Sequence, residues 1–206
     1  MTLPSLVRPE AEGDFRLAQR CLAGDPGAQR ELFRAYKKGV HATLFRILGS
    51  NAPMDDLLQD TFINVYRSLR IYRGEASLAT WVDRCTVRVA YAFITQRKRR
   101  PALLELVPDV PSGDANAEDR ALAREAARHL YAALDKMDPK LRLAFTLHAI
   151  DGRPLTEVAS LMEATLVATK TRVWRARRQL AARARKDAVL ASFVKDDRGD
   201  EEGEEA

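Results

Sequence analysis

Apolar residues recur every three or four positions along most of the chain, which is the period of an α-helix. Segments 28–48, 55–69 and 77–100 each carry one apolar stripe at this spacing. The strict alternation of apolar and polar residues that marks a strand is hard to find anywhere in the sequence. We therefore predict an all-α protein.

Turn and cap residues set the limits of these segments. A Gly-Asp-Pro-Gly turn precedes the first segment, Asp55 and Asp56 open the second, and Ser77 is a candidate N-cap for the third. After Pro101 the composition shifts to Pro, Gly, Asp, Asn and Glu, with five acids and no base up to residue 119. This composition is typical of an interdomain linker.

Two closely spaced helical segments lie near the end of the second half of the chain. Helices resume near Ala121, and segments 155–161 and 167–184 each present an inward apolar face. A short helix, a tight turn and a longer helix form a helix-turn-helix. We expect two small helical domains, and the predicted parts are a helical bundle at 14–100, a flexible linker at 101–120, a helix-turn-helix domain at 121–186 and an acidic, disordered tail at 187–206.

The charge is distributed unevenly along the 206 residues. Lys and Arg total 34 against 29 Asp and Glu, which gives a net charge of +5. The last twelve residues hold seven acids and two bases, so the preceding part carries +10. The isoelectric point is about 9.4 even with that tail. A body this basic predicts a polyanionic partner, and nucleic acid is the first candidate.

Several classes of protein are disfavoured by what the sequence lacks. The N-terminal residues do not form the apolar core of a signal peptide, and no stretch reaches the roughly 20 apolar residues of a membrane span. Cys21 and Cys85 belong to no disulfide framework or zinc motif. We expect a reduced, cytoplasmic location, no membrane insertion and no metal or other cofactor.

The final helical segment is the strongest candidate for binding duplex DNA. Residues 164–186 hold eight bases and no acid. When the apolar positions point inward, Trp174 and its basic neighbours point outward, as expected of a helix that lies in the major groove. The alternative is a basic helix face that is merely solvated. The candidate contacts are Lys170, Thr171, Arg172, Trp174, Arg175 and Arg178.

A second basic stretch, residues 84–100, holds six bases, and aromatic residues are interleaved with it. Charge beside aromatic faces suits the binding of single strands or flipped bases. The alternative is that the aromatics belong to the core, which we expect of Phe93 and leave open for Trp81. The candidate contacts are Trp81, Arg84, Arg88, Arg97, Lys98, Arg99 and Arg100.

Both halves of the sequence resemble one family. Residues 55–66, DDLLQDTFINVY, and residues 74–81, GEASLATW, resemble region 2 of bacterial sigma factors of the extracytoplasmic-function group. Residues 134–180, with LTEVA at 155–159 and KTRVWRAR at 170–177, resemble region 4 of the same proteins. The two blocks cover nearly all of the predicted folded chain, in the family's order.

The resemblance implies a promoter-specificity subunit that binds core RNA polymerase and acts without covalent catalysis. Region 2 would dock on the polymerase through the 55–69 helix and capture the minus-10 element with the 77–100 helix. Region 4 would read the minus-35 element, and family habit implies an anti-sigma factor as a partner. The candidate polymerase contacts are Asp55, Asp56, Gln59, Asp60, Asn64 and Arg67.

Four residues depart from the pattern of the family that the sequence resembles: Arg88, Asp138, Glu163 and Val167. Asp138 precedes Pro139 where a Leu is more usual, and Val167 replaces a small residue near the helix-turn-helix turn. Arg88 stands where many members have an Asn that helps to hold a flipped minus-10 base. Glu163 replaces a common glycine in the helix-turn-helix turn. A positive φ at this turn would strain Glu163, because L-residues other than Asn and Asp rarely adopt it.

Three other hypotheses follow from the residues. Asp55, Asp56 and Asp60 resemble an aspartate-rich magnesium motif of an enzyme, although the chain offers no second cluster. A helix-turn-helix regulator that acts without polymerase is a second alternative, and binding of purified protein to duplex promoter alone would distinguish it. The acidic tail is either a solubilising end or a segment that competes with DNA for the basic helix.

Overall fold

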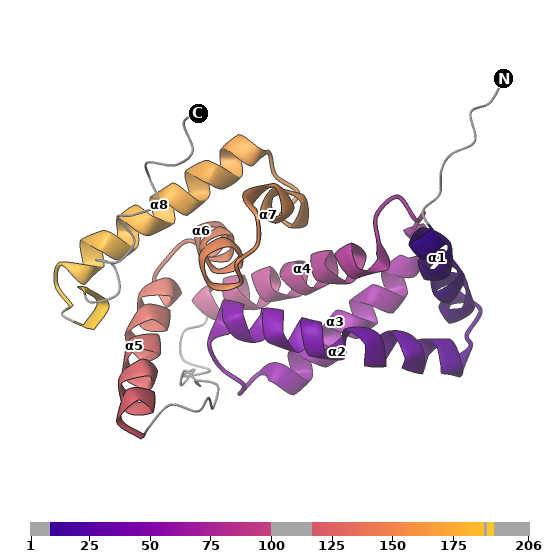
Figure 1. Ribbon diagram of the computed structural model, residues 1–206, viewed down its shortest axis with the longest axis horizontal. Coiled ribbons are helices and arrows are strands. Elements are labelled where there is room, and N and C mark those ends of the chain that lie inside the picture. Colours follow the sequence, from indigo (N-terminus) through magenta and orange to yellow (C-terminus); the bar gives the residue numbers. More distant parts are fainter. Residues whose placement is uncertain (1–8, 100–116, 188, 192–206) are drawn as a thin grey trace.

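The computed structural model describes residues 9–99, 117–187 and 189–191, and all of its regular elements are helical (Figure 1). The predicted all-α class with two sigma-like domains is confirmed. Arg100, most of the predicted linker and residues 188 and 192–206 of the predicted tail lie outside the described residues. The helices are α1 (Pro9–Leu22), α2 (Pro26–Leu48), α3 (Met54–Ser68), the 3-10 turn η1 (Leu69–Ile71), α4 (Leu78–Arg99), α5 (Ala117–Asp135), α6 (Pro139–Phe145), the π-helical turn η3 (Thr146–Ile150), α7 (Leu155–Leu161) and α8 (Leu166–Ala184).

Helix α1 is an element that the hydrophobic pattern did not single out. It places Ala18 and Cys21 in the core, with 1% and 5% of each residue exposed. Its Asp14 carboxylate accepts a hydrogen bond from the backbone N–H of Leu78, with an N···O distance of 2.7 Å. The side chain of Ser77 accepts a second bond, from the N–H of Thr80, as expected of an N-cap. The start of α4 therefore depends on α1 as well as on its own cap.

The main core begins inside the α1–α4 bundle and continues into the second half of the chain. Leu32, Leu44 and Leu78 are fully buried at its centre. The same cluster includes Leu143, Leu147, Val158 and Leu161, which come from α6, η3 and α7. Figure 1 shows these elements beside α2 and α4. The two predicted domains therefore share apolar packing.

A smaller cluster joins α5 to α8. Leu134, Met137, Ala176 and Leu180 are buried there. Leu190 is buried in the same cluster, so packed structure extends past residue 186 into the range assigned to the tail. Helix α5 begins at Ala117, slightly before the predicted start near residue 121.

The end of α2 touches α5 at a glycine. Gly49 closes α2 in the left-handed conformation, with φ of 77°, and its N–H bonds to the carbonyl of Phe45. A β-carbon at this position would lie 2.5 Å from the ring of Tyr131. The Tyr131 hydroxyl donates to the carbonyl oxygen of Arg46 at 2.6 Å. A side chain at position 49 is therefore excluded both by φ and by the neighbouring helix.

We expect the substitution Asp14→Ala to lower the free energy of unfolding by about 1 kcal/mol, because it removes a helix cap. The measurement is the urea midpoint followed by circular dichroism. Glu12→Ala is the matched control, since Glu12 is exposed and forms an ion pair with Arg16 of the same helix. Equal midpoints for the two variants would show that the contact between α1 and α4 contributes nothing measurable.

Candidate nucleic-acid interface

Helices α7 and α8 form the predicted helix-turn-helix. Val158 and Leu161 on α7 and Ala176 on α8 are buried, so the two helices cross through small and branched side chains. Thr165 caps α8, its hydroxyl accepting from the N–H of Ala168 at 3.2 Å. Glu163 in the turn has φ of 49°. The strain expected from replacing the turn glycine is therefore present in the structure.

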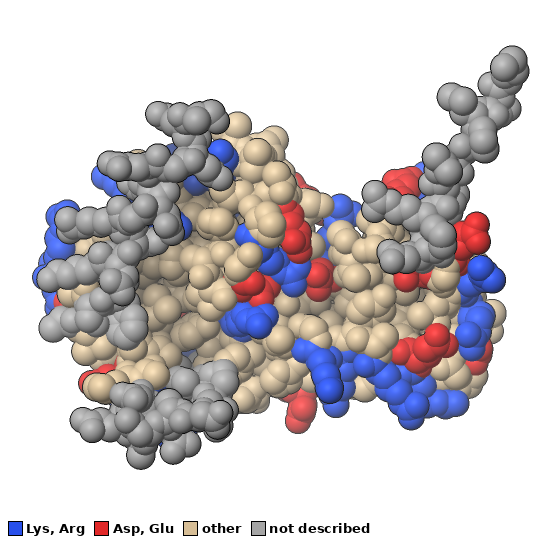
Figure 2. All heavy atoms as spheres, viewed as in Figure 1, with Lys and Arg blue, Asp and Glu red and all other residues tan. Residues whose placement is uncertain are grey.

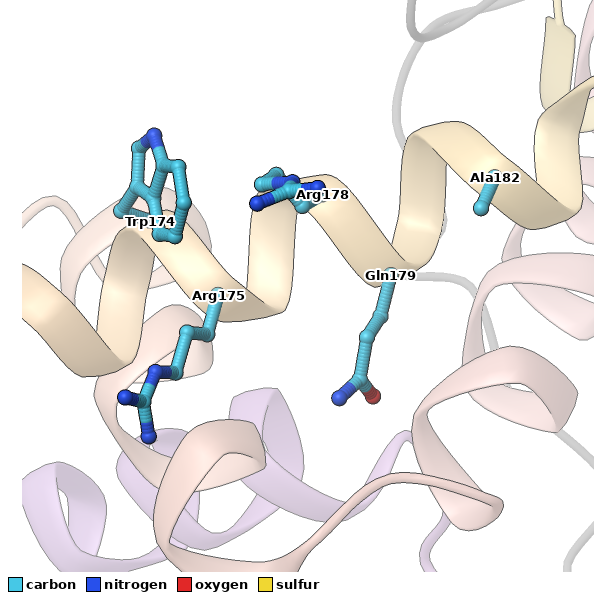
Figure 3. Close-up of a pocket in the computed structure, with 5 residues that line it drawn as sticks. All are labelled: Trp174, Arg175, Arg178, Gln179 and Ala182. Atoms are coloured by element: carbon cyan, nitrogen blue, oxygen red, sulfur yellow. The ribbon is translucent and has the colours of Figure 1, made fainter.

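The outer face of α8 is exposed as its spacing predicted. Lys170, Thr171, Trp174, Arg175 and Arg178 are all exposed, whereas Arg172 is half-buried. The Arg178 guanidinium lies 4.7 Å from the centre of the Trp174 ring, which is cation–π distance. Figure 3 shows Trp174 and Arg178 along the helix with Arg175 and Gln179 projecting beneath them, and these residues line a shallow hollow. The face presents cationic donors and one aromatic surface together.

Sequence reasoning noted Val167 as a departure from the family pattern but did not assign it a contact on this face. It is the second residue of α8, and 75% of it is exposed. The N-terminal residues of a recognition helix are those that reach base edges, and an apolar side chain suits the methyl group of thymine. The available signal was an apolar residue out of register with the buried stripe of Val173, Ala176 and Leu180.

The first two basic side chains of α4 contact α7 and the turn that follows it. The Arg84 Nη2 atom donates to the Ser160 hydroxyl at 2.9 Å. Arg88 forms an ion pair with Glu163, and both side chains of this pair are more than half exposed. These contacts join residues 75 and 76 positions apart in the chain.

The later basic side chains of α4 contact the region around α5. Arg97 forms a two-pronged ion pair with Asp135, at 2.8 and 3.2 Å. The Lys98 ammonium donates to the carbonyl oxygen of Met137 at 3.1 Å. Arg99 ends α4. The structure thus gathers Arg84, Arg88, Arg97 and Lys98 on one helix, each bonded to the second half of the chain.

Trp81, one turn before Arg84 on α4, lies at the edge of the core. Its indole N–H donates to the Ser68 hydroxyl at 2.9 Å. The ring meets that of Tyr72 edge-on, with centroids 5.4 Å apart. The indole is half-buried, so only part of its surface is open to a base. Phe93 packs against the core as predicted.

Helix α3 presents a third surface, which is acidic and polar. The buried stripe of Leu58, Phe62 and Val65 faces the bundle. Ile63, which sequence reasoning did not single out, is exposed beside the polar residues. The six predicted polymerase contacts are all exposed on the outer side: Asp55, Asp56, Gln59, Asp60, Asn64 and Arg67.

Two arginines of the second half reach into the bundle. The side chain of Arg142 is 1% exposed, pairs with Asp135, and donates twice to the carbonyl oxygen of Ile47, at 3.1 and 3.2 Å. Burial lowers the pKa of Arg142, and the charge of Asp135 offsets part of this effect.

Arg153 contacts both α4 and α2. It bonds to Asp83 at 2.6 Å and to the Thr43 hydroxyl at 3.1 Å, and also pairs with Asp151 and Glu157. Burial favours a lower pKa for Arg153, but the hydrogen bonds to Asp83 and Asp151 outweigh it and raise the pKa above its usual value. Figure 2 shows acidic and basic side chains gathered in the middle of the molecule, over the junction of its two halves.

Within the described ranges the structure offers no metal site or membrane span. No group of three or more His, Cys, Asp or Glu in these ranges is arranged to hold a metal ion. No helix there is both long and apolar enough to cross a membrane.

A basic helix-turn-helix joined to a bundle with a second basic helix defines a helical protein with two candidate DNA-binding surfaces. Residues 32–100 match the sigma-70 region 2 family, and residues 127–180 match the sigma-70 region 4 family. The chain belongs to the sigma-70 family, in the extracytoplasmic-function group, whose members are transcription initiation factors. It is an alternative sigma factor that directs RNA polymerase to promoters.

Relatives in other bacteria agree with this assignment. The extracytoplasmic-function sigma-E factor of Haemophilus influenzae is 28% identical over 176 residues, covering 81% of this chain and 93% of the relative. The sigma-E factor of Escherichia coli K12 is 28% identical over 173 residues, covering 80% and 90%. The fold resembles that of the sigma factor RpoE in complex with the anti-sigma factor NepR from Bartonella quintana, with a TM-score of 0.56, 18% identity and coverage of 82% and 98%.

Both cysteines should react slowly with iodoacetamide in the folded protein near neutral pH. Burial raises the pKa of the Cys21 and Cys85 thiols, which reduces the reactive thiolate. We expect alkylation to accelerate by about tenfold or more in urea, when both thiols become exposed. Mass spectrometry of timed samples measures the rates at each cysteine. Rapid modification of Cys85 in the folded protein would contradict this expectation.

Proposed function

We propose that this sigma factor divides its work among three surfaces. Helix α8 reads the minus-35 duplex, α4 holds the separated strand of the minus-10 element, and α3 docks on core polymerase. The observation that carries the proposal is the separation of these surfaces: a basic exposed face on α8, four cations along α4 and an acidic exposed face on α3. The two domains are region 2 at 14–100 and region 4 at 121–186.

The minus-35 contacts are Lys170, Thr171, Arg172, Trp174, Arg175 and Arg178. Arginine and lysine can bind guanine edges or phosphates, and the threonine hydroxyl can bond to either. Val167 adds an apolar contact at the start of the helix. Half-buried Arg172 suits a phosphate at the side of the groove better than a base.

The minus-10 surface combines charge with partial aromatic exposure. Arg84, Arg88, Arg97 and Lys98 neutralise phosphates, with Arg99 and Arg100 extending the basic run, and the open edge of Trp81 offers a surface to a base. Arginine at position 88 is a donor only, whereas asparagine both donates and accepts. The base preferred at the minus-10 element should therefore differ from that of relatives with asparagine.

Initiation by this protein consists of recognition and strand separation, with no covalent step of its own. The acidic face of α3 suits a basic surface on core polymerase, and exposed Ile63 supplies an apolar centre. Because a solved structure of similar fold is that of a sigma factor in complex with an anti-sigma factor, we include an anti-sigma factor among the partners. We place the protein in the cytoplasm, because the promoters it would bind are on the chromosome.

Run-off transcription with bacterial core polymerase tests the proposal. A library of promoter fragments is transcribed with and without the protein, and new start sites are aligned. Start sites that appear only when the protein is added support the assignment and reveal both elements. No new transcripts, together with no co-elution with core polymerase, would favour a regulator that binds DNA without polymerase.

Arg175→Ala should weaken binding to a minus-35 duplex found in this way by about 1–3 kcal/mol, which is the range for one good base contact. The measurement is holoenzyme binding to that duplex at fixed salt. Arg16→Ala removes the same charge from α1, where it is exposed and pairs with Glu12. Equal losses in the two variants would indicate a general charge effect and contradict the assigned role.

The double substitution Asp56→Ala with Asp60→Ala should weaken association with core polymerase by about tenfold, because it removes charges that face a basic partner. Binding of free protein to DNA should not fall. Glu12→Ala with Glu31→Ala is the control of equal charge on other exposed positions of the bundle. If both double variants bind core equally well, α3 does not dock through these acids.

A further inference from the structure

Trp81 is the aromatic residue of the proposed minus-10 surface, and two neighbours fix its ring. The indole N–H donates to the Ser68 hydroxyl at 2.9 Å. The ring meets that of Tyr72 edge-on, with centroids 5.4 Å apart. A half-buried indole can turn about its side-chain torsions unless a specific contact holds it. The bond to Ser68 therefore selects one orientation of the ring.

The Ser68 hydroxyl is itself held by three groups. A serine hydroxyl has one proton to donate and two lone pairs that accept. The proton goes to the carbonyl oxygen of Val65 at 2.9 Å, within the last turn of α3. The lone pairs serve the Trp81 N–H and the Cys85 thiol, whose sulfur lies 3.6 Å from the hydroxyl oxygen. Burial raises the pKa of this thiol, so it keeps a proton to donate. All the hydrogen-bonding capacity of the hydroxyl is thus used in fixing its own position and that of the indole.

Tyr72 is fixed as firmly as Ser68. Only 4% of Tyr72 is exposed, and its hydroxyl donates to the carbonyl oxygen of Ala76 at 2.8 Å. This bond closes residues 72–76, which lead toward α4. Ser68 ends α3 and Tyr72 follows η1, so both contacts with the indole come from outside α4. The ring of Trp81 is therefore supported across the bundle as well as by its own helix.

We propose that Ser68 is a positioning residue for Trp81, and that it holds the indole with its open edge toward the separated minus-10 strand. This inference rests on the proposed contact between Trp81 and a base of that strand. Ser68 itself touches no DNA. By selecting the orientation of the ring in the free protein, it reduces the ordering cost that binding a base would otherwise carry. Without the hydroxyl, the ring samples other orientations, and only a fraction of the molecules present it correctly.

A purely structural role for Ser68 predicts different behaviour. Loss of the hydroxyl would then destabilise the bundle and weaken every activity together. A positioning role predicts a loss confined to the contact that Trp81 makes. Because the hydroxyl bonds toward α4, its removal leaves the exposed polar face of α3 in place. Association with core polymerase should therefore be retained.

Binding of holoenzyme to a promoter with a mismatched, already open minus-10 segment tests the inference. The probe is a fluorescent fragment of a promoter that the run-off assay identifies. We expect Ser68→Ala to weaken this binding by about three- to tenfold, which is part of what stacking on one base contributes. Ser68→Thr keeps a hydroxyl and should restore most of the binding.

A double-mutant cycle shows whether Ser68 acts through Trp81. In the background of Trp81→Ala, the substitution Ser68→Ala should cause no further loss of binding to the open promoter, because the effects of residues in contact are not additive. A further loss as large as that in the wild-type background would overturn the positioning role.

Thr86→Val is the matched control. Thr86 lies on α4, and its buried hydroxyl donates to the carbonyl oxygen of Val82 in the same helix at 2.9 Å. The substitution removes a buried hydroxyl and leaves the bond between Ser68 and Trp81 in place. We expect it to weaken binding to the open promoter less than Ser68→Ala does. Equal losses would indicate general damage to the bundle and contradict the inference.

Fluorescence of the free, full-length protein follows the ring itself. The chain has two tryptophans, so Trp174→Phe leaves Trp81 as the only one. In that background, Ser68→Ala should shift the emission to longer wavelength and increase quenching by acrylamide, because the indole is no longer held at the edge of the core. Ser68→Thr should emit as the parent does. Identical emission and quenching in Ser68→Ala and the parent would overturn the inference.

Failure of the proposed function would look different. If holoenzyme with Trp81→Ala bound the open promoter as tightly as the wild type, the proposed contact between Trp81 and the strand would be wrong. If that holoenzyme bound weakly while Ser68→Ala bound as the wild type does, only the positioning role would be wrong.

Discussion

The guanidinium of Arg142 is the contact on which the arrangement of the two halves depends. It donates to the carbonyl oxygens of Ile47 and Leu48, which end α2 and have no partner within that helix. Asp135 supplies the opposing charge. A buried arginine without these partners would be strongly unfavourable, so the contact forms completely or the halves separate. Few intermediate arrangements satisfy all of its donors.

The position of Arg142 also determines what its neighbours can reach. With α6 held against the end of α2, Asp135 faces Arg97 as well as Arg142. Arg153 then lies between Asp83 of α4 and Thr43 of α2. The Asp135 carboxylate pairs with two arginines, and Arg153 bonds to two of the bundle helices, α2 and α4. The charges between the halves are therefore shared, and they act as a unit more than as separate pairs.

Helix positions could be predicted from periodicity because each long helix buries one apolar stripe. Helix α1 was not predicted, because its buried residues Ala18 and Cys21 are small and contribute little to the hydrophobic pattern. The outward orientation of Trp174 and Arg175 followed from the inward positions of Val173 and Ala176. The spacing of apolar residues was enough to predict the orientation of a side chain wherever a single helix determines that orientation.

Contacts between distant segments could not be predicted in this way. Arg142 has the sequence context of a surface residue, and its partners at Ile47 and Leu48 are backbone atoms that no side-chain pattern reveals. Glu163 and Arg88 each stood out as unusual, but their 75-residue separation concealed the link between them. Periodicity describes the faces of single helices and says nothing about which faces meet.

The effect of substituting Gly49 depends on how the two halves of the chain are arranged. The cost of a left-handed φ is present in any arrangement, since it belongs to the end of α2. The collision with the Tyr131 ring exists only while α5 lies against that end. A side chain at position 49 would clash with Tyr131 and push α5 away from the end of α2. A substitution at this glycine therefore costs more while α5 lies against the end of α2 than it would with the two apart.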